Sequence, residues 1–132
     1  MIRVLLDTNA WLWMASNDAR LGTLARTLIT DPKTELVLSA VSAWEISIKW
    51  ALGKLPLPVP PEQFVDTTVR DGGLKRLSIE FDHVLGVAKL PPIHNDPFDR
   101  LLIAQSFATA MPLLTGDDTI GRYGTATIDA RR

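Results

Sequence analysis

The sequence predicts an α/β fold, a three-layer α/β/α sandwich with a mostly parallel central sheet. Short apolar runs alternate along the chain with longer segments of helical periodicity, a pattern typical of parallel sheets that are covered on both faces. The chain has 132 residues, and 46% of them are hydrophobic, so a core can form without disulfides or a structural metal. We therefore expect residues 1–132 to form a single domain.

In the first half of the chain, two short apolar runs alternate with three segments of helical periodicity. The run at residues 2–6 is rich in leucine and β-branched side chains, and it ends in Asp7, Thr8 and Asn9, which are helix-capping residue types. Gly53 is a suitable residue to follow a helix end. The predicted elements are a strand at 2–6, helices at 9–15 and 19–29, a strand at 35–39 and a helix at 41–52.

Prolines mark the boundaries of elements in the second half. Residues 55–61 contain four prolines, which exclude a helix or a central strand and predict an extended connector. Pro61 and Pro97 each suit the first turn of a helix. The predicted elements are a helix at 61–70, a strand at 74–79, helices at 81–89 and 97–110, and strands at 112–115 and 126–128.

Composition excludes several classes of protein. The chain has 15 acidic and 14 basic residues, so no bulk positive charge marks it as a nucleic-acid binder. It has no cysteine and two histidines, which excludes disulfide scaffolds, thiolate sites and multi-histidine metal sites. The longest uncharged run, residues 101–116, is shorter than a membrane span of about 20 residues. We expect a cytoplasmic protein with no membrane association.

Two acidic residues follow predicted strands. Asp7 comes directly after the first strand, and Asp117 comes just after the strand at 112–115. Ligands of open parallel sheets bind at the carboxyl ends of the strands. Each acid also has a purely structural interpretation, because Asp is a favoured N-cap; for Asp117 or Asp118 the capped segment would be 119–123.

Glu45 has two interpretations, which depend on where its helix begins. If the helix begins at Ser42, Glu45 completes a capping box with it. If it begins at Ser39, Glu45 lies in the second turn. One face of the helix then carries Val41, Glu45, Ile48 and Leu52. A carboxylate on a buried face is costly unless another group compensates it.

Asp99 presents a similar problem. With Asn95 or Asp96 as the N-cap and Pro97 in the first position, Asp99 lies in the first turn of a helix, where the helix dipole favours an acid. Yet it shares a face with Leu102 and Ile103, the apolar side of that helix. Asp99 is therefore expected to point partly inward, as Glu45 does in the second of its interpretations.

Four carboxylates at one position repel one another. A pair about 4 Å apart repels by about 4 kcal/mol at an effective dielectric constant of 20. A divalent cation reverses the sign of this interaction, and oxygen ligands favour magnesium or manganese (Mg2+ or Mn2+). Magnesium held by a few carboxylates commonly meets phosphate oxygens. The acids therefore predict metal-dependent phosphodiester hydrolysis.

Four segments of the chain resemble, in order and spacing, the PIN-domain ribonucleases, and more narrowly the VapC-type toxins of bacterial toxin–antitoxin pairs. They are residues 5–13, 39–46, 94–105 and 113–117, and the third is the most specific. The resemblance implies RNA cleavage, a homodimer and inhibition by a small antitoxin protein. It also implies an α/β/α sandwich and a Mg2+ or Mn2+ site held by Asp7, Glu45, Asp99 and Asp117.

The residues around these motifs leave some choices open. Asp96 either assists at the site or only caps its helix, and Asp117 and Asp118 compete for the fourth position. Arg100 is expected to pair with Asp96 or Asp99. His94 either lies at the mouth of the site or is structural, the more common role of a lone histidine before a helix. The four tryptophans are expected to lie mostly in the core, with some at a subunit or partner interface.

Two other functions compete with an RNA-cleaving toxin. A degenerate PIN-like module could bind nucleic acid or protein without catalysis, but such a module normally loses acids and this chain has all four. A DNA-directed nuclease would use the same metal chemistry, because metal-assisted hydrolysis does not need the 2′-hydroxyl group.

Overall fold

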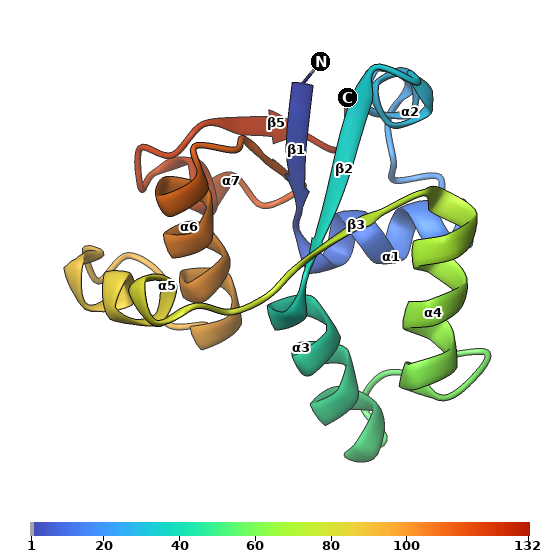
Figure 1. The fold of residues 1–132 in the computed structure, drawn as a ribbon, viewed down its shortest axis with the longest axis horizontal. Coiled ribbons are helices and arrows are strands. Elements are labelled where there is room, and N and C mark those ends of the chain that lie inside the picture. The colour runs from blue at the N-terminus through green and yellow to red at the C-terminus, as the bar shows by residue number, and fades with distance from the viewer. Residues whose placement is uncertain (1) are drawn as a thin grey trace.

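The computed structural model describes residues 2–132 and shows a five-stranded, all-parallel sheet with helices on both faces (Figure 1). The strand order is β3-β2-β1-β4-β5, with every neighbouring pair parallel. The predicted α/β sandwich is confirmed. The strands are β1 (Ile2–Leu6), β2 (Thr34–Ser39), β3 (Lys75–Leu77), β4 (Leu113–Thr115) and β5 (Thr127–Asp129).

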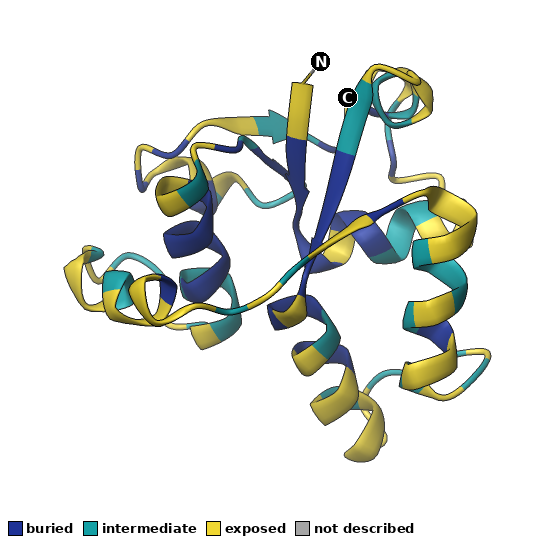
Figure 2. Cartoon of the chain, in the orientation of Figure 1, coloured by how far each residue is buried: buried dark blue, intermediate teal, exposed yellow. Residues whose placement is uncertain are grey.

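The central strand β1 is buried on both sides. Its neighbours are β2, where Val4 lies opposite Leu36, and β4, where Leu5 lies opposite Leu113. Successive side chains point to opposite faces, so Val4 and Leu6 join one core cluster while Leu5 joins another. Figure 2 shows the buried colour concentrated on β1, β2 and the inner faces of the helices.

Helices alternate with the strands and fill both faces of the sheet. Those of the first half are α1 (Thr8–Ser16), α2 (Thr23–Thr30), α3 (Ala40–Ala51) and α4 (Pro61–Gly72). Those of the second half are α5 (Phe81–Gly86), the 3-10 turn η1 (Val87–Lys89), α6 (Pro97–Thr109) and α7 (Asp118–Gly121). No helix within residues 2–132 is long and apolar enough to cross a membrane.

The predicted helix at 19–29 is wrong at its start. Helix α2 begins only at Thr23, because the backbone of Gly22 lies against the chain's C-terminal segment. Its N–H donates to the carbonyl oxygen of Ala130 at 2.9 Å, and a Cβ at Gly22 would lie 2.0 Å from the carbonyl carbon of Arg132. Before it, Asp18 accepts a hydrogen bond from the backbone N–H of Arg20, and the chain forms a turn at Ala19 and Arg20 instead of a helix.

Candidate metal centre

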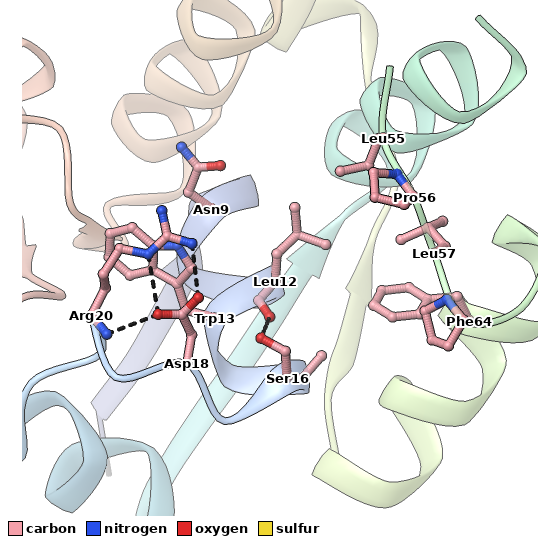
Figure 3. Close-up of a pocket in the computed structure, with 12 residues that line it drawn as sticks. Asn9, Leu12, Trp13, Ser16, Asp18, Arg20, Leu55, Pro56, Leu57 and Phe64 are labelled. Atoms are coloured by element: carbon pink, nitrogen blue, oxygen red, sulfur yellow. Dashed lines mark hydrogen bonds and ion pairs between the residues drawn. The ribbon is translucent and has the colours of Figure 1, made fainter. Parts of the chain in front are cut away.

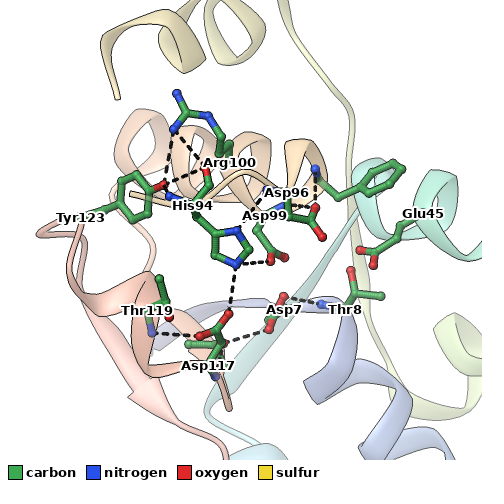
Figure 4. A network of polar contacts seen from close by, with 12 residues as sticks. Asp7, Thr8, Glu45, His94, Asp96, Asp99, Arg100, Asp117, Thr119 and Tyr123 are labelled. Carbon is green, nitrogen blue, oxygen red and sulfur yellow. Dashed lines mark hydrogen bonds and ion pairs between the residues drawn. The ribbon is translucent and has the colours of Figure 1, made fainter. Parts of the chain in front are cut away.

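The parallel strands bring the four predicted acids together at one edge of the sheet (Figure 4). Asp7 follows β1, Glu45 lies on the helix that follows β2, and Asp117 comes two residues after β4. Asp99 reaches the same place from the first turn of α6. The pKa of Asp99 reflects this proximity, because the negative charges of Asp7, Glu45 and Asp117 all raise it.

Asp7 is both a helix cap and a member of this cluster. It is 3% exposed, and it caps α1 by accepting the Thr8 N–H at 2.8 Å on Oδ1. Its Oδ2 accepts the hydroxyl of Thr115 at 2.8 Å. Burial raises its pKa to about 6, despite these two hydrogen bonds that lower it. Asp7 is therefore the N-cap of α1, as its structural interpretation predicts, and its role as a ligand stays a prediction.

Glu45 lies in the second turn of α3, and the capping-box interpretation with Ser42 is wrong. The N-cap is Ser39, which accepts the Val41 N–H at 3.0 Å. The Ser42 hydroxyl instead lies 2.9 Å from that of Thr8. Glu45 is 6% exposed and points toward the other acids (Figure 4).

The two oxygens of the Glu45 carboxylate have different surroundings. Oε2 pairs with Lys49 Nζ at 2.5 Å. Oε1 is buried and has no hydrogen-bond partner within residues 2–132. Such an atom is costly unless a ligand satisfies it. The predicted apolar face holds only at the start of the helix, since Ile48 and Leu52 are exposed where α3 extends beyond the core.

Asp99 carries the most strongly raised pKa in the cluster. Asp96 is the N-cap of α6 and accepts the N–H groups of Phe98 and Asp99 with Oδ1. The Asp99 side chain is 17% exposed. Burial, followed by repulsion from the neighbouring acids, raises its pKa to about 8. The inward orientation predicted for Asp99 is confirmed, and Asp96 is the cap.

The fourth acid beside this group is Asp117 and not Asp118. Asp117 caps α7 through the Thr119 N–H, and its own N–H donates to the Thr115 hydroxyl at 3.0 Å. Asp118 is 87% exposed and pairs with Arg131 at 2.6 Å. The Thr115 hydroxyl therefore bonds both Asp7 and Asp117 and fixes their relative positions.

His94 is a fifth polar residue of the centre. It lies beside the acids, as the interpretation that placed it at the mouth of the site predicts. Its Nε2 lies 3.1 Å from Asp99 Oδ2 and 3.3 Å from Asp117 Oδ2. Its Nδ1 accepts the backbone N–H of Asp96 at 3.0 Å. The sequence signal was its position two residues before the N-cap of α6, which places it at the entrance to the helix that carries Asp99.

Arg100 does not pair with Asp96 or Asp99, and that prediction is wrong. Its guanidinium donates to the backbone carbonyls of Val87 at 3.1 Å and Pro91 at 2.9 Å. It points away from the acids because α6 turns successive side chains by about 100°. Arg100 thus holds the segment that leads to His94.

The tryptophans divide between core and surface. Trp11 is fully buried and packs against Phe64 with ring centroids 5.3 Å apart. Trp44 and Trp50 are exposed on α3. Trp11 and the partly buried Trp13 belong to the core as predicted, and Trp44 and Trp50 lie on the surface, where their place at an interface stays a prediction.

A separate groove, with a volume of about 430 Å³, contains none of the four acids. It lies between α1, the proline-rich connector and α4 (Figure 3). Leu12, Trp13, Leu57 and Phe64 provide apolar lining, and Arg20 stacks over Trp13 at 5.1 Å.

Asp99 and Asp117 have the spacing of a divalent-cation site, whereas Asp7 and Glu45 lie outside the group of atoms that meets this spacing. One oxygen of Asp99, one oxygen of Asp117 and a ring nitrogen of His94 all lie within 4.8 Å of one another. Carboxylate oxygens are the donors that magnesium and manganese prefer. A cation would relieve the repulsion that raises the pKa of Asp99, and it would give the buried Glu45 Oε1 a partner. A cation at this place would account for both of these features.

Comparisons with known proteins agree with this geometry. The family model of the PIN domain matches residues 4–125. Ribonuclease VapC16 of Mycobacterium tuberculosis (strain ATCC 25618 / H37Rv) is 41% identical over 58 residues. That alignment covers 44% of this chain and 41% of the relative, so it spans less than half of the curated protein.

Solved structures share the fold over nearly the whole chain. VapBC2 from Rickettsia felis, bound to a DNA fragment from its promoter, superposes with a TM-score of 0.71 at 12% identity, covering 97% of this chain and 98% of that one. DNA-bound VapBC from Salmonella typhimurium gives a TM-score of 0.68 at 13% identity, covering 98% of each chain. At these identities the likeness shows the fold alone.

Proposed function

The chain belongs to the PIN domain family and is related to VapC ribonucleases, and from this premise we propose that it is a metal-dependent ribonuclease. It hydrolyses RNA phosphodiester bonds and acts as the toxin of a toxin–antitoxin pair, with residues 1–132 as one functional domain. The observation that carries this proposal is the meeting of four carboxylates at the carboxyl edge of the sheet, where Glu45 Oε1 is buried and has no partner among residues 2–132.

Asp7, Glu45, Asp99 and Asp117 would hold one or two Mg2+ or Mn2+ ions. When bound, such an ion polarises the phosphate and lowers the pKa of a coordinated water. The chain supplies position: Thr8 and Thr115 orient the Asp7 carboxylate, and the Thr115 hydroxyl couples it to Asp117. These rigid contacts keep the oxygens converged in spite of their repulsion.

An antitoxin partner follows from the same premise. The structural neighbours include VapBC complexes from Rickettsia felis and Salmonella typhimurium. A partner segment that covers the acids could use an arginine, because its fork matches carboxylate geometry and its charge replaces the cation. Co-expression with the adjacent short reading frame and pull-down should recover a complex. An active chain that is harmless to its host without a partner would contradict the toxin role.

The second candidate function is a degenerate PIN-like module that binds nucleic acid or protein without catalysis. The presence of all four acids at one place speaks against it, since a module without catalysis has no use for buried carboxylates that repel one another. It would bind RNA without cleaving it in the assay below.

The test is an RNase assay on the purified chain with Mn2+, with Mg2+, and with EDTA. We expect metal-dependent cleavage of single-stranded RNA by the wild type and none by Asp7→Asn, which keeps the size and capping ability of Asp7. A DNA strand of the same sequence in parallel separates ribonuclease from general nuclease activity. Folded protein that leaves RNA intact with either metal would contradict the proposal.

A further inference from the structure

Two basic side chains, Lys49 and His94, donate hydrogen bonds to the four acids, one at each end of the cluster. Lys49 Nζ pairs with Glu45 Oε2 at 2.5 Å. At the other end, His94 Nε2 lies between Asp99 Oδ2 and Asp117 Oδ2, at 3.1 and 3.3 Å. The two donors therefore bond oxygens from three of the four carboxylates that would bind a metal.

His94 is a donor at this position and not a metal ligand. Its Nδ1 accepts the Asp96 N–H, so Nδ1 has no proton of its own and the proton of the neutral ring lies on Nε2. A protonated Nε2 has no lone pair to offer a metal. The same proton explains how Nε2 can approach two carboxylates at once, which an unprotonated nitrogen would repel.

Metal and these donors compete for the same oxygens. A divalent cation bound at Glu45 repels the Lys49 ammonium on the same carboxylate. A cation between Asp99 and Asp117 would compete with the His94 N–H, because the atoms of all three residues lie within 4.8 Å of one another. Metal binding would therefore break both contacts and leave Lys49 Nζ and His94 Nε2 free to donate to another acceptor, such as a phosphate bound to the metal.

We propose that Lys49 and His94 are phosphate-contacting residues of the nucleic-acid site, which divalent metal releases from the carboxylates they hold. This inference depends on the proposed function, because nucleic acid is the ligand. A phosphodiester carries negative oxygens that accept charged or neutral donors strongly. Lys49 lies on the α3 side of the acid cluster and His94 on its α7 side. The sugar-phosphate backbone of the bound nucleic acid therefore crosses the cluster from one of these side chains to the other.

The other cations near the site are committed elsewhere. Arg100 bonds backbone carbonyls, and Arg131 pairs with Asp118 and Asp129. Within residues 2–132, Lys49 is the cation that pairs with one of the four acids. It also keeps enough freedom to turn, since its side chain is 42% exposed.

The test compares RNA affinity with and without metal. The probe is a fluorescein-labelled single-stranded RNA followed by anisotropy, in Ca2+ or in EDTA, with a gel to verify that the strand stays intact. The variants are Lys49→Met, His94→Ala and His94→Gln. The matched control is Lys33→Met, which removes the same charge from the opposite, amino-terminal edge of the sheet, just before β2.

In Ca2+, Lys49→Met and His94→Ala should each weaken RNA binding about tenfold or more, as expected for the loss of a bond to a charged group. In EDTA the change should be no larger than that of Lys33→Met. His94→Gln should recover part of the affinity, because its amide keeps a donor near the position of Nε2. In Ca2+, Lys49→Met should release about one counterion fewer than the wild type when RNA binds, as measured by the salt dependence of the affinity. In EDTA this number should not change.

Three results would overturn this inference in distinguishable ways. Equal weakening in Ca2+ and EDTA would show that metal does not release the donors. A loss of metal-induced stabilisation in His94→Ala melts would make His94 a metal ligand. If the wild type bound no RNA in either condition, the proposed function itself would be wrong.

Discussion

Two polar clusters, one buried and the other partly buried, lie close to the end of β2, and they are built in opposite ways. In the first, the Ser39 hydroxyl donates to Gln105 Oε1 at 2.5 Å, and Gln105 Nε2 donates to the Ser78 carbonyl at 3.4 Å and lies 3.3 Å from His83 Nδ1. Its three side chains are uncharged as bonded, and each has a partner. The second is the acid cluster, whose members repel one another and leave Glu45 Oε1 without a partner.

The two histidines make the contrast sharper. His83 and His94 both accept a backbone N–H on Nδ1, from Glu80 at 3.1 Å and from Asp96 at 3.0 Å. The same local device therefore serves two purposes. His83 lies within a satisfied network that joins α5 to α6, while His94 aims its Nε2 at two carboxylates. Buried polar groups that support a fold are paired, whereas this charged cluster lacks compensation that a ligand could supply.

The largest effect should come from Asp99→Asn. Removing the carboxylate charge should lower metal-dependent RNA cleavage by about 100-fold or more. The metal-free protein should melt at a higher temperature than the wild type, because a buried and repelled charge is gone. Cleavage assays and melts in EDTA measure the two effects. Full activity of Asp99→Asn together with an inactive Asp96→Asn would show that the ligand is Asp96, one helical turn earlier, and not Asp99.

A substitution in the uncharged cluster of Ser39, Gln105 and His83 should have the opposite effect on stability. Gln105→Ala should lower the free energy of unfolding by about 2 to 4 kcal/mol, since it leaves a cavity and removes the partner of Ser39. Metal should still raise the melting temperature by the same amount as in the wild type. Denaturant titrations with and without Mn2+ test this, and a lost metal response would mean that the two clusters are not independent.

The pH dependence of stability should separate the clusters further. The pKa values of Asp7 and Asp99 are raised from 3.8 to about 6 and about 8 in the folded protein, mainly by burial. The folded state then holds more protons than the unfolded state between about pH 4 and pH 8. The contribution of these two acids to the stability of the metal-free protein should therefore fall as pH rises through that range. Melts of wild type and Asp99→Asn should show a steeper decline for the wild type.

The smallest effects should come from the acids outside the cluster. Asp96→Asn should change stability little, because Asn caps a helix as well as Asp. Asp118→Asn breaks only an exposed pair with Arg131, and such pairs contribute about 0 to 1 kcal/mol. Both variants should keep most of the cleavage activity in the same assay. A large loss in Asp118→Asn would extend the site beyond the buried acids.

Local patterns predicted the elements and the four converging acids, because both depend on local periodicity and on the parallel order of strands. The run at 2–6 is the buried strand β1, and Asp7 follows it at the carboxyl edge. What could not be predicted depends on contacts between distant segments. The start of α2 is set by the C-terminal segment beside Gly22, and the direction of Arg100 is set by the carbonyls of Val87 and Pro91.

The site shows the same division. Local sequence does not decide between the two helix starts for Glu45, since both Ser39 and Ser42 can cap a helix. The structure decides it through the contact between the hydroxyls of Ser42 and Thr8, 34 positions apart in the chain. The position of His94 beside Asp117 likewise depends on the loop that Arg100 and Tyr123 hold.

The central claim is that the four acids form a shared site for a divalent cation, and thermal melts at pH 7.5 with EDTA or Mn2+ test it most directly. A ligand that binds only the folded state stabilises it by about 2.7 kcal/mol at 100 times its Kd. We predict that millimolar Mn2+ raises the melting temperature of the wild type by several degrees and leaves that of Asp7→Asn and Asp99→Asn nearly unchanged. A wild-type melting temperature that does not respond to Mn2+, or an equal rise in all three proteins, would contradict the claim.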